Sequence, residues 1–300
     1  MSLSVLKDIR KIYAGLNANE VRLAAARELR IGLLATSENG WLEMKDFLLA
    51  GHRDLDARGQ ALRMLYRLSP GIGAEDGRRD DMDFVLVEPG LGLPRNGYPF
   101  GPAGALYNSG GSGGGASEKD LIDSIVCENQ PVELALARSF PVFREAVARR
   151  IVTRISRENA TLALVTALPN VLPSFVELPW VVGEFATDTA FLTMNQVRMA
   201  LMMAAIYDRP VGYSEQKGSI AAIAGGAFGW RAIARELVGK IPLGGGLIPK
   251  AAIAYAGTWV VGTGLDRLYR TGAGWTRNEK REAWKSALAR GRQIAAGLRH

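Results

Sequence analysis

The chain of 300 residues contains few of the side chains that most catalytic and metal sites use, with one cysteine and two histidines. A single cysteine, Cys127, excludes an internal disulfide and a cysteine-based zinc site. His300 is the last residue, and we expect His52 to lie in an exposed turn. The chain has no His-Glu-x-x-His string and no Asp-rich calcium loop. We therefore predict no metal, no cofactor and no enzymatic activity.

The chain also lacks the Gly-x-x-x-x-Gly-Lys-Ser/Thr string, whose backbone amides and lysine hold phosphate groups. A match to the Gly-x-Ser-x-Gly nucleophile elbow at residues 110–114 lies in repetitive Gly/Ser sequence with no strand before it, which favours a linker. Residues 30–35, followed by Thr36-Ser37-Glu38-Asn39-Gly40, nevertheless have the strand–loop–helix layout of a nucleotide-binding fold. Residues 84–90 likewise fit a strand and turn of a G domain. A degenerate GTPase-like protein with a vestigial G domain is thus one alternative.

Charge is scarce in one part of the chain and mostly positive in another. Residues 160–265 contain 13 charged residues, about half of the chain-wide density of 22%. Residues 266–300 contain nine Lys or Arg against three acidic residues, and so account for almost all of the net charge of +7. A basic segment next to an apolar region favours an anionic lipid surface over nucleic acid, because each Lys or Arg near such a surface contributes about 1 kcal/mol. An ordinary solvated helix face is the alternative.

Hydrophobic spacing predicts a mainly α fold: a C-terminal helical bundle with a Gly-rich helical hairpin, preceded by a small α/β or helical N-terminal unit. Residues 30–35 and 82–87 are predicted strands, with helices at 41–50 and 55–68 between them. Residues 88–116 contain ten Gly and four Pro, and we place a flexible linker at 89–116. The predicted domains are residues 1–88, the helical domain 117–270 and a basic tail helix 271–300. Beyond the linker, helices are expected at residues 121–138, 142–157, 188–207, 219–240, 251–269 and 278–298.

No segment has the roughly 20 consecutive apolar residues that a membrane-spanning helix needs. The best one, residues 160–183, contains Glu177 and three prolines. Small residues in two neighbouring predicted helices permit the close packing that helices adopt in lipid. These residues are Gly225, Gly226 and Gly229 in one helix, and Gly257 and Gly262 in the next. We predict a compact bundle whose surface touches membrane; an inserted hairpin and a soluble scaffold that binds protein are the alternatives.

The last predicted helix is amphipathic and basic. Its cations Arg281, Lys285 and Arg292 are predicted to attract an anionic surface. Trp284 and Leu288 are predicted to supply an apolar anchor, as in interfacial helices. The N-terminal sequence Met-Ser-Leu-Ser-Val-Leu-Lys-Asp has no apolar stretch typical of a secretory signal. Together these features predict the cytosolic face of the membrane, with the cytoplasm as the alternative.

Residues 225–262, Gly-Gly-Ala-Phe-Gly-Trp-Arg-Ala-Ile-Ala-Arg-Glu-Leu-Val-Gly-Lys-Ile-Pro-Leu-Gly-Gly-Gly-Leu-Ile-Pro-Lys-Ala-Ala-Ile-Ala-Tyr-Ala-Gly-Thr-Trp-Val-Val-Gly, have a distinctive pattern. They resemble the uncharacterised helical domain that follows the G domain of bacterial Era-like GTPases and also occurs in inner-membrane proteins without one. Residues 167–173 and 192–201, with Tyr207, look like earlier parts of the same domain, so the resemblance covers about residues 145–270. The resemblance implies membrane association and a link to GTPase-like proteins, and it brings no catalytic residues. We also expect membrane lipid and a protein partner to bind this chain. The missing P-loop sets this chain apart from the GTPase members.

Overall fold

The computed structural model describes residues 18–70, 81–100, 117–165, 188–212, 215–216, 218 and 247–298. The chain divides into two compact units. Arg22–Val147 form the α/β unit, and Met1–Val21 with Ala148–His300 form the helical unit. The expected division at residues 89–116 differs from this one. Strand β4 (Gly97–Pro99), inside the expected linker, pairs with the sheet, and residues 117–147 group with the α/β unit.

A four-stranded parallel sheet organises the α/β unit, with the strand order β2-β1-β3-β4. The central strands β1 (Ile31–Leu34) and β3 (Phe84–Val87) are buried at every position, which is why both read as short continuous apolar runs. Gly32 in β1 leaves room for its neighbours, because a Cβ there would lie 2.7 Å from Leu68 Cδ1 and 3.1 Å from Val85 Cγ2. Both central strands coincide with predicted ones.

Edge strand β2 (Leu65–Leu68) corrects the sequence interpretation, which extended a helix over residues 55–68. Helix α4 ends at Leu62 (Leu55–Leu62), and the following residues pair in parallel with β1. The apolar side chains at 61, 62, 65 and 68 have helical spacing, so the pattern alone favours a longer helix. Hydrogen bonding to β1, a contact distant in sequence, overrides that local preference.

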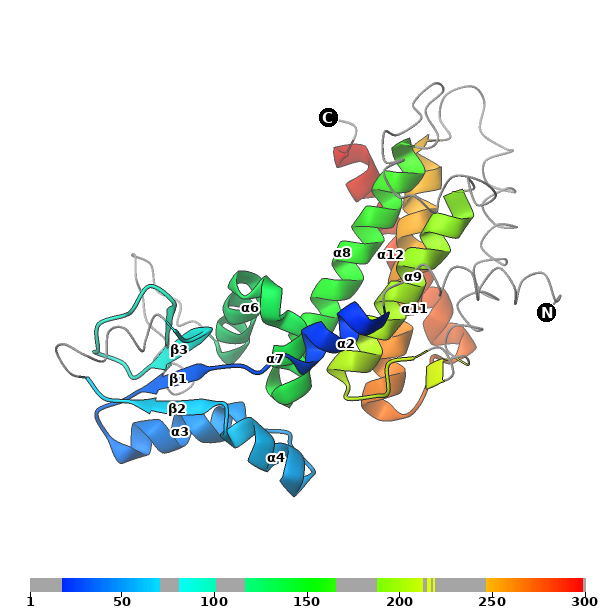
Figure 1. Cartoon of the computed structure of the whole chain (residues 1–300). Helices are drawn as coiled ribbons and strands as arrows, with labels where there is room; N and C mark the ends of the chain where they lie inside the picture. The colour runs from blue at the N-terminus through cyan, green and yellow to red at the C-terminus, as the bar shows by residue number, and fades with distance from the viewer. Residues whose placement is uncertain are drawn as a thin grey trace. The chain divides into compact units, whose positions relative to one another are not determined.

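Helices complete the α/β unit. Helix α3 (Glu38–Leu48) lies beside the sheet, while α6 (Glu118–Glu128) and α7 (Glu133–Ser139) follow later in the chain (Figure 1). The predicted single helix at 121–138 is therefore wrong: α6 ends at Glu128, and a short 3₁₀ turn (Gln130–Val132) precedes α7. Pro131 lies in that turn, and proline disrupts a helix interior. Ser117 caps α6 through a capping box with Asp120. A T-shaped contact between Phe84 and Phe143, with ring centroids 6.4 Å apart, adds to the core.

Long helices make up the described part of the helical unit: α8 (Arg144–Val165), α9 (Asp188–Ile206), α11 (Leu247–Thr271) and α12 (Arg277–Gly297) (Figure 1). Of these, α8 begins in the α/β unit. The mainly α fold class is thus confirmed, with an α/β rather than helical N-terminal unit. The predicted helix at 219–240 lies outside the described residues. Within the described ranges, no helix is both long enough and apolar enough to span a bilayer.

A buried amide network ties α8, α9 and α11 together. The Thr258 hydroxyl accepts hydrogen bonds from Asn159 Nδ2 at 2.8 Å and Gln196 Nε2 at 3.1 Å, and donates to the carbonyl of Ala254. Asn195 in turn donates to Asn159 Oδ1 at 2.8 Å. Because these hydrogen bonds form only when the three helices are aligned, the network favours one register between them.

Candidate functional site

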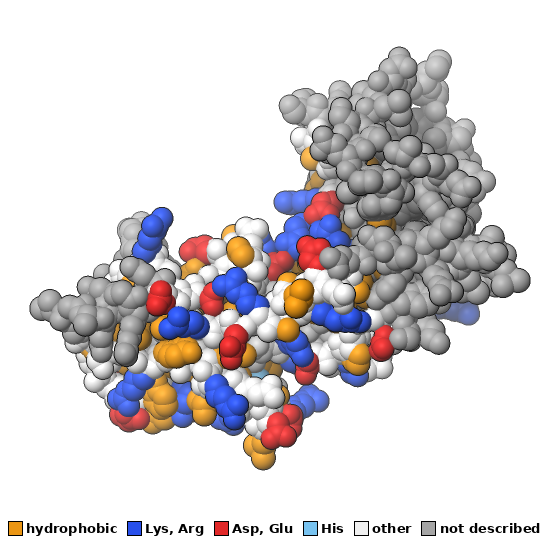
Figure 2. Space-filling model, in the orientation of Figure 1, with side chains coloured by type: hydrophobic (Ala, Val, Ile, Leu, Met, Phe, Trp, Pro, Cys, Tyr) orange, Lys and Arg blue, Asp and Glu red, His pale blue; other side chains and the backbone are white. Residues whose placement is uncertain are grey.

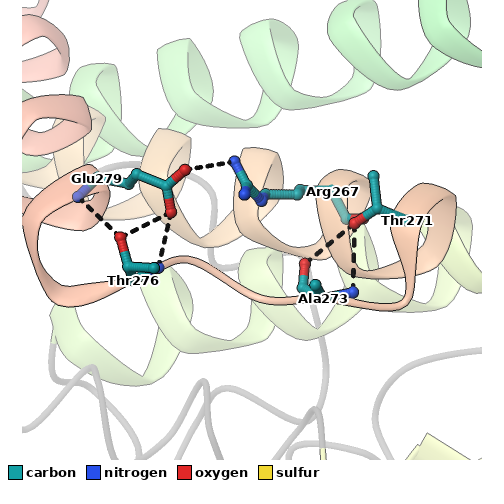
Figure 3. A network of polar contacts seen from close by, with 5 residues as sticks. All are labelled: Arg267, Thr271, Ala273, Thr276 and Glu279. Atoms are coloured by element: carbon teal, nitrogen blue, oxygen red, sulfur yellow. Dashed lines mark hydrogen bonds and ion pairs between the residues drawn. The ribbon is translucent and has the colours of Figure 1, made fainter.

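The turn before α12 is fixed by side-chain hydrogen bonds (Figure 3). Thr276 and Glu279 form a capping box, in which the Thr276 side chain accepts from the Glu279 backbone and the Glu279 carboxylate accepts from Thr276 N and Oγ1. Arg267 on α11 reaches the same carboxylate at 3.0 Å (Figure 3). These hydrogen bonds hold the pKa of Glu279 below its usual value, with a smaller contribution from the Arg267 charge. One carboxylate therefore both begins α12 and joins it to α11.

Three further features hold this turn. Gly272 adopts φ of 76°, a left-handed conformation that favours glycine. Trp275 covers Gly264 of α11, where a Cβ would lie 2.9 Å from the indole ring. The Arg267 guanidinium lies 5.1 Å from the centre of the same indole, a cation–π distance. The start of α12 is thus attached to α11 by ionic, aromatic and backbone contacts.

Small residues form the buried face of α12. Ala287, Gly291 and Ala295 recur every four residues and are all buried. At Gly291 the two helices approach so closely that a Cβ would lie 2.8 Å from the Ala252 carbonyl oxygen and 3.1 Å from its Cα. Because the obstacle is backbone, no side-chain movement could relieve it. Gly291 therefore determines how near α12 comes to α11, although the sequence had drawn attention to other glycines.

Trp284 and Leu288, the predicted apolar anchor, pack against α11 in the structure. Both are partly buried beside a cluster of Ala256, Val260 and Ala287. The sequence correctly placed them on the apolar side of the helix and assigned lipid as the neighbour. In the structure, the neighbour of this side is α11.

The three predicted cations of α12 form one exposed row. Arg281, Lys285 and Arg292 are each exposed. At about 100° per residue, they fall within about 40° of one another around the helix and span about 16 Å along it. Lys285 also contacts Glu282 at 2.8 Å, a surface pair that leaves its charge accessible. We call these three residues the cation row.

Two of the five glycines predicted to line a helical hairpin lie in the described part of the chain. Gly225, Gly226 and Gly229 lie outside the described residues. Gly257 is buried in α11. Gly262 faces α8 and α9, since a Cβ there would lie 2.6 Å from Val152 Cγ2 and 2.8 Å from Met199 Sδ. Gly262 thus permits close packing of α11 against α8 and α9, whereas the partner helix of the predicted hairpin, residues 219–240, lies outside the described residues.

A second polar cluster lies at the carboxyl ends of β1 and β3. The Glu88 carboxylate accepts hydrogen bonds from Thr36 N and Oγ1, both at 2.6 Å, and from Ser37 Oγ at 2.7 Å and Ser37 N at 3.4 Å. Ser37 also caps α3 through Gly40 N. These hydrogen bonds, led by that from the Thr36 hydroxyl, lower the pKa of Glu88 to about 2. Glu88 is therefore a fixed anion at the start of α3.

The location of this cluster bears on nucleotide binding. In open parallel sheets, ligands bind at the carboxyl ends where neighbouring strands continue to opposite sides, and β1 and β3 meet at such a point here. The backbone amides at a helix start favour an anion there. In this chain Glu88 accepts from the Thr36 and Ser37 amides just before α3, and Ser37 Oγ accepts from the Gly40 amide inside it. The carboxylate also lies close to the helix, since a Cβ at Gly40 would be 2.5 Å from its Oε1. The sequence indicated the loop and missed Glu88, although an acidic residue directly after an apolar strand was the available signal.

The described part of the chain does not favour a catalytic or metal-binding role for His52. His52 is half-buried rather than exposed; burial lowers its pKa, and the charges of Arg144 and Arg58 lower it further. A neutral imidazole at neutral pH follows. Over the same ranges no three His, Cys, Asp or Glu side chains gather as a metal site would require.

The two units carry opposite net charges. The α/β unit has 14 Lys or Arg and 18 Asp or Glu, a net charge of −4, which leaves +11 for the helical unit. Among the described residues on the face that Figure 2 shows, basic and acidic side chains are interspersed. The positive charge is therefore a property of the unit that contains α12.

Comparison of the chain with protein-family models, with curated proteins and with solved structures gave no match. The chemistry of the cation row and of the Glu88 cluster is therefore the basis for the functional proposal.

Proposed function

We propose that the protein is a non-enzymatic, membrane-associated helical protein that binds the anionic cytosolic face of a membrane through the cation row of α12. The observation that carries this proposal is the exposure of Arg281, Lys285 and Arg292 in one row along a helix whose adjacent side packs on α11. The net charge of +11 on the helical unit adds long-range attraction to such a surface. The resemblance to the helical domain of Era-like GTPases supports the same location, where a protein partner would be engaged.

Vesicle binding by full-length protein tests the proposal. The triple variant Arg281→Gln, Lys285→Gln, Arg292→Gln should bind phosphatidylserine-containing vesicles more weakly by about 3 kcal/mol, or roughly 150-fold, at about 1 kcal/mol per cation. The control variant Arg53→Gln, Arg63→Gln, Arg95→Gln removes the same charge from exposed positions of the α/β unit and should bind like the wild type. Equal binding by the two triple variants would refute the assignment. Charge substitution is preferable to deletion of α12, which would uncover Val260 on α11.

A degenerate nucleotide-binding protein is the second candidate, and the parallel sheet with Thr36 and Ser37 at the β1/β3 junction favours it. Glu88 argues against it in the wild-type chain, because its carboxylate already accepts the hydrogen bonds that a phosphate would need. Titration calorimetry with GTP and magnesium decides between the two candidates. We expect no heat of binding at millimolar nucleotide, and saturable heat would favour this second candidate.

A further inference from the structure

We propose that α12 binds the membrane as a docked helix, with the cation row on lipid phosphates while Trp284 and Leu288 remain packed on α11. This inference rests on the proposed function and adds its mode: electrostatic adsorption to anionic headgroups, without insertion of apolar side chains. It replaces the amphipathic-anchor mode that the sequence of α12 favours.

Contacts along the whole of α12 hold it on α11. Near its middle, Ala287 packs with Ala256 and Val260, and one turn later Gly291 lies against the Ala252 backbone. Further on, Ala295 belongs to a buried cluster with Tyr255. Arg290 adds an exposed contact, with its guanidinium 5.9 Å from the centre of the Trp259 ring. Release of α12 would break all of these contacts together.

The turn shown in Figure 3 holds the start of the helix in the same way. Its Arg267–Glu279 ion pair and the Trp275 indole over Gly264 both join α12 or the turn to α11. A hinge at this point would have to separate the capping carboxylate of α12 from its partner on α11. The helix and its attachment are therefore one rigid element.

Transfer of α12 alone into lipid would leave α11 uncovered. Trp284 and Leu288 are already partly buried against α11, so their transfer would remove only their remaining exposed area from water. Ala256, Val260 and Tyr255 of α11 would lose their cover, and exposure of apolar area to water is unfavourable. The cation row is already exposed and needs no rearrangement to reach phosphates. Docked binding thus obtains the electrostatic attraction and keeps the α11–α12 contact.

Fluorescence quenching by lipids with brominated acyl chains tests the binding mode. Full-length wild type and Trp284→Phe are compared on phosphatidylserine-containing vesicles, because bromine quenches an indole that enters the acyl region. We expect the variant to bind within about twofold of the wild type and both proteins to show the same quenching. Quenching that disappears in Trp284→Phe, or affinity that falls tenfold or more, would overturn docked binding while leaving membrane association intact.

Salt dependence gives a second measurement that needs no substitution. Electrostatic adsorption should be lost between about 0.1 M and about 0.5 M salt, as the Debye length shortens. Retention of most binding at the higher salt would indicate apolar insertion and overturn the inference. If the wild-type protein does not bind anionic vesicles at low salt, the proposed function itself is overturned, and docked binding with it. The two failures are therefore distinguishable.

Discussion

Replacement of Glu88 by alanine should destabilise the α/β unit, because it removes the acceptor for four donors on Thr36 and Ser37. The decrease of the Glu88 pKa from 4.5 to about 2 would correspond to about 3 kcal/mol if solvent did not screen the carboxylate. Because the carboxyl is only partly buried, water can replace part of its hydrogen bonding. We therefore expect Glu88→Ala to lower the free energy of unfolding by about 2 kcal/mol at neutral pH.

The assay is urea unfolding of the full-length chain, followed by circular dichroism and by tryptophan fluorescence. Trp41 is the only tryptophan of the α/β unit and reports on α3, next to the cluster. The control is Glu43→Ala, which removes an exposed carboxylate from the same helix and should change stability by less than about 0.5 kcal/mol. A double-mutant cycle with Thr36→Val isolates the Glu88–Thr36 interaction and should give a coupling of about 1 kcal/mol. Additive effects of the two substitutions would refute the assigned hydrogen bond.

The same hydrogen bonds define a pH dependence. Since the folded-state pKa of Glu88 lies below the unfolded value, its contribution is complete above about pH 4.5 and is lost as the pH falls toward about 2. The stability difference between wild type and Glu88→Ala should therefore be constant at neutral pH and narrow across this acidic range. A difference that stayed constant down to the lowest pH would show that the charge of Glu88 has no role.

Three further substitutions test the helical unit by urea unfolding, and two control substitutions accompany them. Thr276→Ala removes the cap of α12 and should lower the free energy of unfolding by about 1 kcal/mol; an unchanged value would contradict the capping role. Gly291→Ala should destabilise by about 1–3 kcal/mol because its Cβ meets the α11 backbone. Gly59→Ala, inside α4 with open space around it, should instead stabilise by up to about 1 kcal/mol, and the same sign for both glycines would refute the packing argument. Thr258→Val leaves two buried amide donors without their acceptor and should lower stability by about 2 kcal/mol. Thr263→Val, whose hydroxyl bonds only within its own helix, serves as the control and should have less than half that effect.

Local pattern was sufficient to predict the elements whose burial is uniform or periodic. Strands β1 and β3 are buried at every position, so each is a short continuous apolar run that the sequence shows directly. Helix α12 is predictable because its apolar residues recur with helical spacing. Strand β2 was missed since its middle residues, Tyr66 and Arg67, are exposed and only pairing with β1 makes it a strand. The spacing of apolar residues shows which side of a helix or strand is buried. It does not show which distant segment of the chain packs or pairs with that side.

The candidate sites illustrate the same limit. The amphipathic pattern of α12 correctly separated Arg281 from Trp284, yet it could not distinguish α11 from lipid as the neighbour of the apolar side. The donors Thr36 and Ser37 lay in a loop that the sequence identified, whereas their acceptor Glu88 is 51 or 52 residues away. In both places the missing information was a tertiary contact.

The close approach at Gly291 gives the two sides of α12 different tolerance to evolutionary change. Attraction to a charged bilayer depends on how many positive groups a flank presents, so lysine and arginine could exchange, or move by one turn, without loss. The side that packs on α11 has no such freedom, because even a methyl group at position 291 meets the carbonyl of Ala252. Among descendants of this chain, the glycine should therefore persist while the individual basic positions drift.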